Sequence, residues 1–444
     1  MATMRPQRFF LIASLILGLT LCALTPPFAV PDEPAHLFRA WSISSAQWSA
    51  PRGGAMIPRS YVRIASSTLE EIRGANGRRF RTSRLRELAR IPLEPSDLIF
   101  VPIPTDSWRH PLQYTAGSYS PFGYAASALA IALSRMLGLP PLMHLYAARV
   151  SNLLLASFLI WFAIRRAPFA RWTIALCALV PMSMYMRASA SLDALTIAMG
   201  LVVIAEALRF AFHSEQRVAP ILMVSFLLGV IKPGYLLIPM LAFLAPAFRQ
   251  RWPAILAVIG AAVSGSALAG IWSAPALGAA PSIAIQPAQR LSTALHHPLA
   301  FAFVFAGNWY ESFSIRLTEM IGTLGWLDAP MPLPFVVITL LGIALVATGD
   351  GPIPRDFRGL RRYVPWLLFA GTVVAITLAG HLYSPAPKFA LAIQGRYFLP
   401  ALPLLFLPLI TGSQPRKWIG QLACTLVMLF AVQTIFTELL RFYL

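Results

Sequence analysis

The chain has 444 residues, of which 57% are hydrophobic and 12% charged, and its mean hydropathy is +0.66. An apolar content this high exceeds that of an ordinary globular domain, so it excludes a water-soluble fold and predicts a protein that lies in a bilayer. The formal net charge of +19 does not indicate nucleic-acid binding, because the basic residues form short clusters between apolar runs, as membrane-flanking residues do.

The first apolar run extends from Phe9 to about Phe28 and follows Arg5 and Arg8. Its length of about 20 residues suits a membrane-spanning helix better than a cleavable signal peptide, so we expect an uncleaved first span with a cytoplasmic N-terminus. The basic clusters between later runs are expected to be cytoplasmic by the positive-inside rule. Those runs occupy roughly 119–138, 143–164, 172–187, 190–212, 219–247, 253–274, 333–348, 364–382, 398–412 and 418–440.

This pattern predicts an all-α integral membrane protein, a multi-helix bundle of about 10–13 spans that forms one domain over residues 1–444. Residues 29–118 form one long polar segment, which we expect to be an extracytoplasmic loop carrying juxtamembrane helices, because its length exempts it from the positive-inside rule. Its arginines and its apolar Leu85, Leu88 and Ile91 suit an amphipathic stretch on the bilayer surface, with membrane lipids as partners. The run 219–247 is too long for one straight span and is expected to break at Lys232-Pro233-Gly234.

Ionisable residues gather on the extracytoplasmic side of this topology. Asp32, Glu33, His36 and Arg39 follow the first span at spacings that one and a half turns of helix could present together. Charged groups at bilayer depth are costly and usually functional, so their convergence predicts a cavity. Carboxylates with Lys, Arg and His could hold a diphosphate or phosphodiester and deprotonate a hydroxyl. The later members are Arg109, His110, Asp193, Lys232, Glu311, Glu319, Asp328, Lys388 and Arg396.

Six motifs in chain order carry a resemblance to a known family. The chain resembles an uncharacterised bacterial family of predicted multi-spanning membrane proteins that is grouped with the GT-C glycosyltransferases, and the resemblance covers nearly the whole sequence. The motifs are Pro31-Asp32-Glu33-Pro34-Ala35-His36, Arg109-His110-Pro111-Leu112-Gln113-Tyr114, Val180-Pro181-Met182 leading to Ser191-Leu192-Asp193-Ala194, Lys232-Pro233-Gly234-Tyr235, Gly325-Trp326-Leu327-Asp328 and Gln394-Gly395-Arg396-Tyr397-Phe398-Leu399-Pro400.

The resemblance implies a GT-C-like fold and a site on the outer face that uses a polyprenyl-phosphate sugar. By similarity, Asp32 takes the place of the catalytic acid, Glu33 is its neighbour, and Asp193 is a second acid. The chain departs from related enzymes at 109–114, where it has one proline and a glutamine. The donor phosphate is expected to meet Lys232, Arg396, Arg109, His110 and Tyr397, and the other site candidates are His36, Arg39, Tyr114, Glu319, Trp326 and Asp328.

The expected activity is inverting sugar transfer to a cell-envelope glycan or lipid in polysaccharide biosynthesis, at the bacterial inner membrane. Asp32 would act as general base, or would hold a divalent cation, Mg²⁺ or Mn²⁺, together with Asp193. The same residues also have structural explanations: Asp32 and Glu33 could cap a helix, and Lys232 and Arg396 could extend to lipid headgroups. Two other functions stay open, a transporter or flippase of lipid-linked saccharides and a non-catalytic subunit of a polysaccharide assembly complex.

Overall fold

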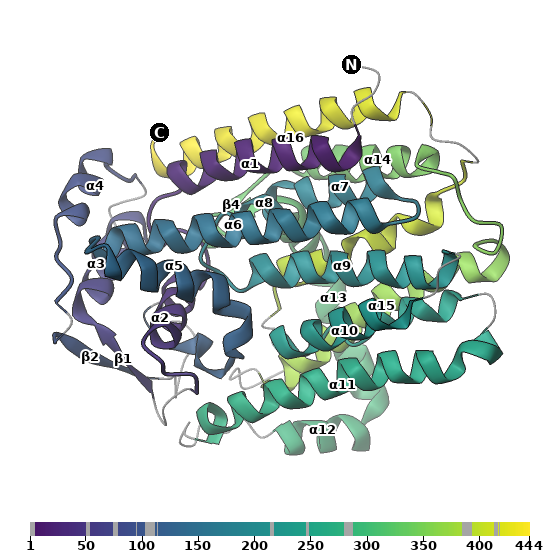
Figure 1. The fold of residues 1–444 in the computed structure, drawn as a ribbon, viewed down its shortest axis with the longest axis horizontal. Helices are drawn as coiled ribbons and strands as arrows, with labels where there is room; N and C mark the ends of the chain where they lie inside the picture. Colours follow the sequence, from purple (N-terminus) through teal and green to yellow (C-terminus); the bar gives the residue numbers. More distant parts are fainter. Residues whose placement is uncertain are drawn as a thin grey trace.

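The computed structural model of the protein is mostly helical, at 76%. It describes residues 5–49, 54–73, 79–94, 96–102, 112, 114–213, 217–245, 248–278, 287–383, 393–412, 416 and 418–444. Long helices run side by side along its long axis, and α3, α4, β1 and β2 lie together at one end (Figure 1).

Within the described ranges, six helices are long and apolar enough to cross a bilayer, which confirms a multi-pass helical membrane protein. Three shorter apolar segments accompany them, and the expected 10–13 spans stay a prediction. The long helices are α1 (Pro6–Leu24), α6 (Pro141–Arg166), α9 (Asp193–Phe212), α11 (Phe248–Gly278), α15 (Val364–Tyr383) and α16 (Ile419–Phe442), and the shorter segments are α10 (Val218–Ile231), α14 (Leu333–Gly349) and residues 395–409.

Prolines divide three of the predicted runs. The run 172–187 splits at Pro181 into α7 (Arg171–Leu179) and α8 (Pro181–Arg187), and Arg187 Nη2 donates to the Ala178 carbonyl at this break, over 2.7 Å. The run 219–247 breaks at Lys232-Pro233-Gly234 as predicted, but its second half is a 3₁₀ segment, η3 (Ile238–Leu244). The run 398–412 is also 3₁₀, η5 (Gly395–Leu405) and η6 (Leu407–Leu409), because its prolines lack the N–H that an α-helix needs.

Two helices lie where no apolar run was predicted, α12 (Pro287–His296) and α13 (Pro298–Gly322). Polar and charged residues such as Asn308, Glu311 and Arg316 interrupt the hydropathy of α13. A short two-stranded sheet, β3 (Thr323–Leu324) and β4 (Ala329–Pro330), encloses the Gly325–Asp328 turn that follows it.

The segment between the first two long helices contains the predicted short helices, α2 (Glu33–Ser44), α3 (Arg59–Arg73) and α4 (Thr82–Ala89). An antiparallel pair of strands, β1 (Gly54–Pro58) and β2 (Leu98–Pro102), was not predicted. Two 3₁₀ turns, η1 (Thr115–Ser118) and η2 (Pro121–Tyr124), then lead into α5 (Ala125–Met136), so the α-helix in the run 119–138 has only 12 residues.

Helix α9 is the most buried of the candidate spans, with 83% of its apolar window inside the protein. Gly200 lets the backbone of η5 approach it, because a Cβ at this position would lie 2.6 Å from Cβ of Pro400. This contact brings the segment that begins at Gly395 against α9, whose first residue is Asp193.

Candidate functional site

Asp32 lies in the turn between α1 and α2, immediately after Pro31. It has a left-handed backbone conformation, φ 63° and ψ 3°, which is uncommon for a residue other than glycine. Its side chain is 42% exposed. The carboxylate is therefore held at a specific angle while still open to a ligand.

Asp32 belongs to a cluster of four charged side chains from four parts of the sequence. Arg396 Nη2 donates to Asp32 Oδ2, and Arg396 Nε lies 3.6 Å from Asp193 Oδ2. Lys232 Nζ donates to Asp193 Oδ1 over 2.6 Å. Two carboxylates and two cations make the cluster neutral. Unlike Asp32, the other three side chains are at most 15% exposed.

Tyrosines surround the ammonium group of Lys232. Its Nζ lies 4.8 Å from the ring centre of Tyr397 and 5.7 Å from that of Tyr119, distances at which the ring faces attract a cation. Tyr235 Oη donates to the Tyr397 carbonyl over 2.8 Å. Beside this group is a cavity of about 170 Å³, lined by Tyr119, Lys232, Pro233, Gly234, Tyr235, Ile376, Ala379, Gly380, Ile393 and Tyr397.

His36 lies next to this cluster and is neutral at pH 7. Burial lowers its pKa to about 4 and outweighs the opposite influence of Asp32 and Asp193. Its Nδ1 shares a hydrogen bond of 2.7 Å with Tyr124 Oη, a phenol whose pKa burial raises well above its ordinary value. Its ring faces that of Tyr119 at 6.1 Å. His36 thus supports the aromatic side of the site.

Arg39 does not join the charged cluster. This fully buried guanidinium donates to the carbonyls of Tyr119 and Trp48, over 3.0 and 2.8 Å, and to Tyr114 Oη over 3.4 Å. Helical spacing places Arg39 on α2, but its contacts lie in the loop segments around α2. Arg39 therefore fixes the backbone at Tyr119, whose ring faces His36 and Lys232.

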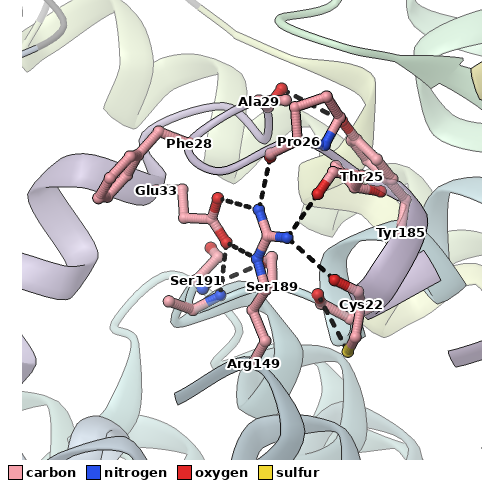
Figure 2. A network of polar contacts seen from close by, with 12 residues as sticks. Cys22, Thr25, Pro26, Phe28, Ala29, Glu33, Arg149, Tyr185, Ser189 and Ser191 are labelled. Atoms are coloured by element: carbon pink, nitrogen blue, oxygen red, sulfur yellow. Dashed lines mark hydrogen bonds and ion pairs between the residues drawn. The ribbon is translucent and has the colours of Figure 1, made fainter. Parts of the chain in front are cut away.

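Glu33 is directed away from Asp32, into the protein. It forms a fully buried ion pair with Arg149 of α6, with 2.8 Å from Nε to Oε1 and 2.7 Å from Nη2 to Oε2 (Figure 2). Arg149 also donates to the carbonyls of Cys22, Thr25 and Pro26. We did not predict Arg149 as a site residue, although a lone arginine inside the apolar run 143–164 was a usable signal.

Glu319 supports the cluster from α13. Its Oε2 accepts the Gly395 N–H over 2.7 Å, and Arg316 donates to the same oxygen over 3.0 Å. Because Gly395 precedes Arg396, this contact fixes the backbone that presents the guanidinium. Glu319 does not contact Asp32 or Asp193 itself, so its place is behind the cluster.

The hydrogen bonds given for Trp326 and Asp328 join them to residues outside the charged cluster. Trp326 Nε1 donates to the Phe28 carbonyl over 3.0 Å, and Asp328 accepts from the Trp326 N–H and from Arg441 Nη2, over 3.1 and 2.6 Å. Asp328 therefore closes the turn at Gly325–Asp328. Arg109, His110 and Lys388 lie outside the described residues.

The cluster does not fit the predicted divalent cation. Asp32 and Asp193 are paired with Arg396 and Lys232, so the two carboxylates offer Mg²⁺ or Mn²⁺ no excess negative charge, and of the two only Asp32 is exposed. Across the part of the chain that the structure describes, no group of three or more His, Cys, Asp and Glu side chains is arranged to hold a metal ion. We therefore derive no step through a metal.

Comparison with known proteins identifies one family. No curated protein and no solved structure matches the chain. The family described as "Predicted membrane protein (DUF2142)" matches residues 15–405, a range that includes Asp32, Asp193, Lys232 and Arg396. Because this match covers most of the sequence, the chain belongs to the DUF2142 family of predicted membrane proteins.

Proposed function

We propose that this protein is a membrane glycosyltransferase of the GT-C type. It transfers a sugar from a polyprenyl-phosphate donor to a glycan or lipid acceptor of the cell envelope, at the extracytoplasmic face of the inner membrane. The observation that carries the proposal is the cluster of Asp32, Asp193, Lys232 and Arg396, whose Lys232 lines a cavity together with three tyrosines.

The two cations are suited to the donor phosphate. Within the described residues Arg396 Nε is buried without a hydrogen-bond partner and lies 3.6 Å from Asp193 Oδ2, while Nη2 donates to Asp32, so a phosphate that takes the place of Asp32 would meet the charge of this guanidinium. Lys232 lines the cavity and can donate further hydrogen bonds beyond the one that Asp193 accepts. Asp193 forms ion pairs with both Lys232 and Arg396 and so keeps the two cations close together before the phosphate binds.

Asp32 is the better placed of the two carboxylates for proton transfer, because it is 42% exposed whereas Asp193 is 9% exposed. In the proposed step, Asp32 takes the proton of an acceptor hydroxyl as the hydroxyl oxygen bonds to the anomeric carbon. The bond between that carbon and the phosphate oxygen breaks, and polyprenyl phosphate leaves with the electron pair. Attack from the face opposite the phosphate inverts the anomeric centre. Binding of the phosphate to Arg396 also frees Asp32 from its ion pair.

The first test is release of polyprenyl phosphate from a labelled polyprenyl-phosphate sugar by the purified protein in proteoliposomes. Lys232→Gln and Arg396→Gln should each reduce release by about 100-fold, because each removes charge that stabilises the leaving phosphate. The control is Arg165→Gln, which removes an exposed cation from the last turn of α6. This variant should release polyprenyl phosphate at the wild-type rate.

Two outcomes would reject the enzyme. Movement of intact donor across the bilayer without cleavage would assign the protein to the flippases. A wild-type protein that neither cleaves nor moves any donor in a panel of polyprenyl-phosphate sugars would leave it as a non-catalytic subunit.

A further inference from the structure

Two residues of α6 each contact one of the two turns that carry the carboxylates of the cluster. Arg149 contacts the turn that carries Asp32, and Asn152 contacts the turn that leads to Asp193. We propose that Arg149 and Asn152 are positioning residues that align Asp32 with Asp193. They lie three residues apart on one face of α6, and neither contacts the charged cluster directly. This inference rests on the proposed function for its catalytic meaning and on the geometry of the two turns for its structural meaning.

The first turn, residues 25–33, is held by Arg149. The guanidinium donates to the carbonyls of Thr25 and Pro26 over 2.7 and 2.9 Å, and to both carboxylate oxygens of Glu33 (Figure 2). Arg149 thus forms hydrogen bonds with both ends of this turn. Asp32 directly precedes Glu33, so the unusual backbone angle of Asp32 is fixed by a contact on the next residue.

The second turn, residues 188–193, is held from the same face. Asn152 Nδ2 donates to the carbonyls of Ser189 and Ser191 over 2.9 and 3.2 Å, and Glu33 Oε1 accepts the Ala190 N–H over 3.1 Å. Ser191 Oγ then accepts the N–H of Asp193 over 3.1 Å. Glu33 is therefore shared: one of its oxygens contacts both Arg149 and the turn that leads to Asp193.

Stability alone does not explain this arrangement. Removing two charges from water is costly, and replacing a buried ion pair by apolar side chains often leaves a protein as stable or makes it more stable. The bidentate geometry and the contacts to two turns are instead what precise alignment requires, since a displacement of about 1 Å can reduce a rate by about 100-fold.

The test replaces the whole pair, Glu33→Met with Arg149→Met, in the full-length protein. The expected result is a kcat about 100-fold below wild type, while the affinity for farnesyl phosphate changes by less than about threefold, because Lys232 and Arg396 come from other elements. Arg149→Lys is the second variant. It keeps the charge and loses the bidentate fork, so it should fold and show the same loss of kcat.

The matched control is Arg166→Met with Glu206→Met. This ion pair joins the same helix α6 to α9, with 2.6 Å from Arg166 Nε to Glu206 Oε1, but it lies about 25 Å along α6 from Arg149. The control should retain turnover within about threefold of wild type.

A second measurement needs no substrate. Asp32→Cys is introduced into the wild-type protein and into the Glu33→Met, Arg149→Met variant. Each cysteine is then modified with an anionic and with a cationic methanethiosulfonate. Beside Lys232 and Arg396 the anionic reagent should react faster, and loss of the Glu33–Arg149 pair should reduce the ratio of the two rates by about threefold or more. An unchanged ratio in a folded variant overturns the proposal, as does a variant kcat within about threefold of wild type. If the wild-type protein shows no turnover, the proposed function fails, and the reagent ratio still decides the positioning role.

Discussion

At the scale of single residues, the titration of His36 makes the stability of the protein depend on pH. Its pKa in the folded protein is about 4, against an ordinary value of 6.5, because burial disfavours the charged ring. The unfolded chain therefore binds the proton first as the pH falls. The contribution of His36 to stability is complete above pH 6.5 and is lost progressively between pH 6.5 and pH 4.

The prediction compares the wild-type protein with His36→Gln, which cannot titrate. Between pH 7.5 and pH 5 the wild type should lose about 2 kcal/mol more stability than the variant, since each pKa unit corresponds to about 1.4 kcal/mol. Thermal melting in detergent at both pH values measures this difference. An equal loss in the two proteins would show that His36 is charged or exposed in the folded state.

At the scale of elements, the 3₁₀ segment η5 presents Arg396 only if it packs closely on α13. Gly395 makes this possible, because a Cβ at its position would lie 2.7 Å from the Met320 nitrogen and 2.8 Å from Cβ of Glu319. Such distances are shorter than van der Waals contact, so any side chain must push η5 away from α13.

We expect Gly395→Ala to destabilise the protein by about 1–3 kcal/mol and to reduce turnover at least tenfold, through displacement of Arg396. Gly307→Ala is the control on the neighbouring α13. A Cβ at Gly307 meets nothing within 4 Å, so this substitution should leave turnover unchanged and stabilise the helix by about 0.5–1 kcal/mol. The measurements are thermal melting and turnover of the Gly395→Ala and Gly307→Ala proteins. Equal turnover by these two variants would show that displacement of η5 does not impair the site.

At the scale of the whole molecule, the basic end of α6 and the group of small helices and strands lie at opposite ends of the protein. Arg165 and Arg166 end α6, whereas α3, α4 and the β1–β2 pair lie at the opposite end, near the C-terminus (Figure 1). The Phe80 N–H donates to the Phe442 carbonyl over 2.5 Å, which ties the α4 region to the end of α16.

This arrangement predicts the orientation in the membrane. A cysteine at exposed Ser66 in α3 should react with an impermeant thiol reagent in intact cells, and a cysteine at exposed Arg355 should react only after permeabilisation. The reverse pattern would place the charged cluster on the cytoplasmic side and would contradict an extracytoplasmic donor.

Hydropathy and turn residues predicted the helical membrane fold and the break at Lys232-Pro233-Gly234. They missed α13, whose polar residues interrupt the apolar pattern, because hydropathy does not record which residues other helices cover. The four charged residues of the cluster were predicted as site candidates from the resemblance and from their cost in a bilayer. Sequence spacing could not show which of Asp32 and Glu33 is buried, because the two residues are adjacent and either side chain could point into the protein. The ion pair with Arg149 shows that Glu33 is the buried one.

The most direct test of the central claim compares Asp32→Asn with Asp328→Asn. The two carboxylates are matched, since both are paired with an arginine and their side chains are 42% and 43% exposed. Turnover of a polyprenyl-phosphate sugar by both variants is measured beside the wild type. Loss of a general base typically reduces a rate 10²–10⁴-fold, so Asp32→Asn should fall by about that factor while Asp328→Asn stays within about threefold of wild type. An Asp32→Asn protein that melts like the wild type and turns over within about threefold of it would contradict the account.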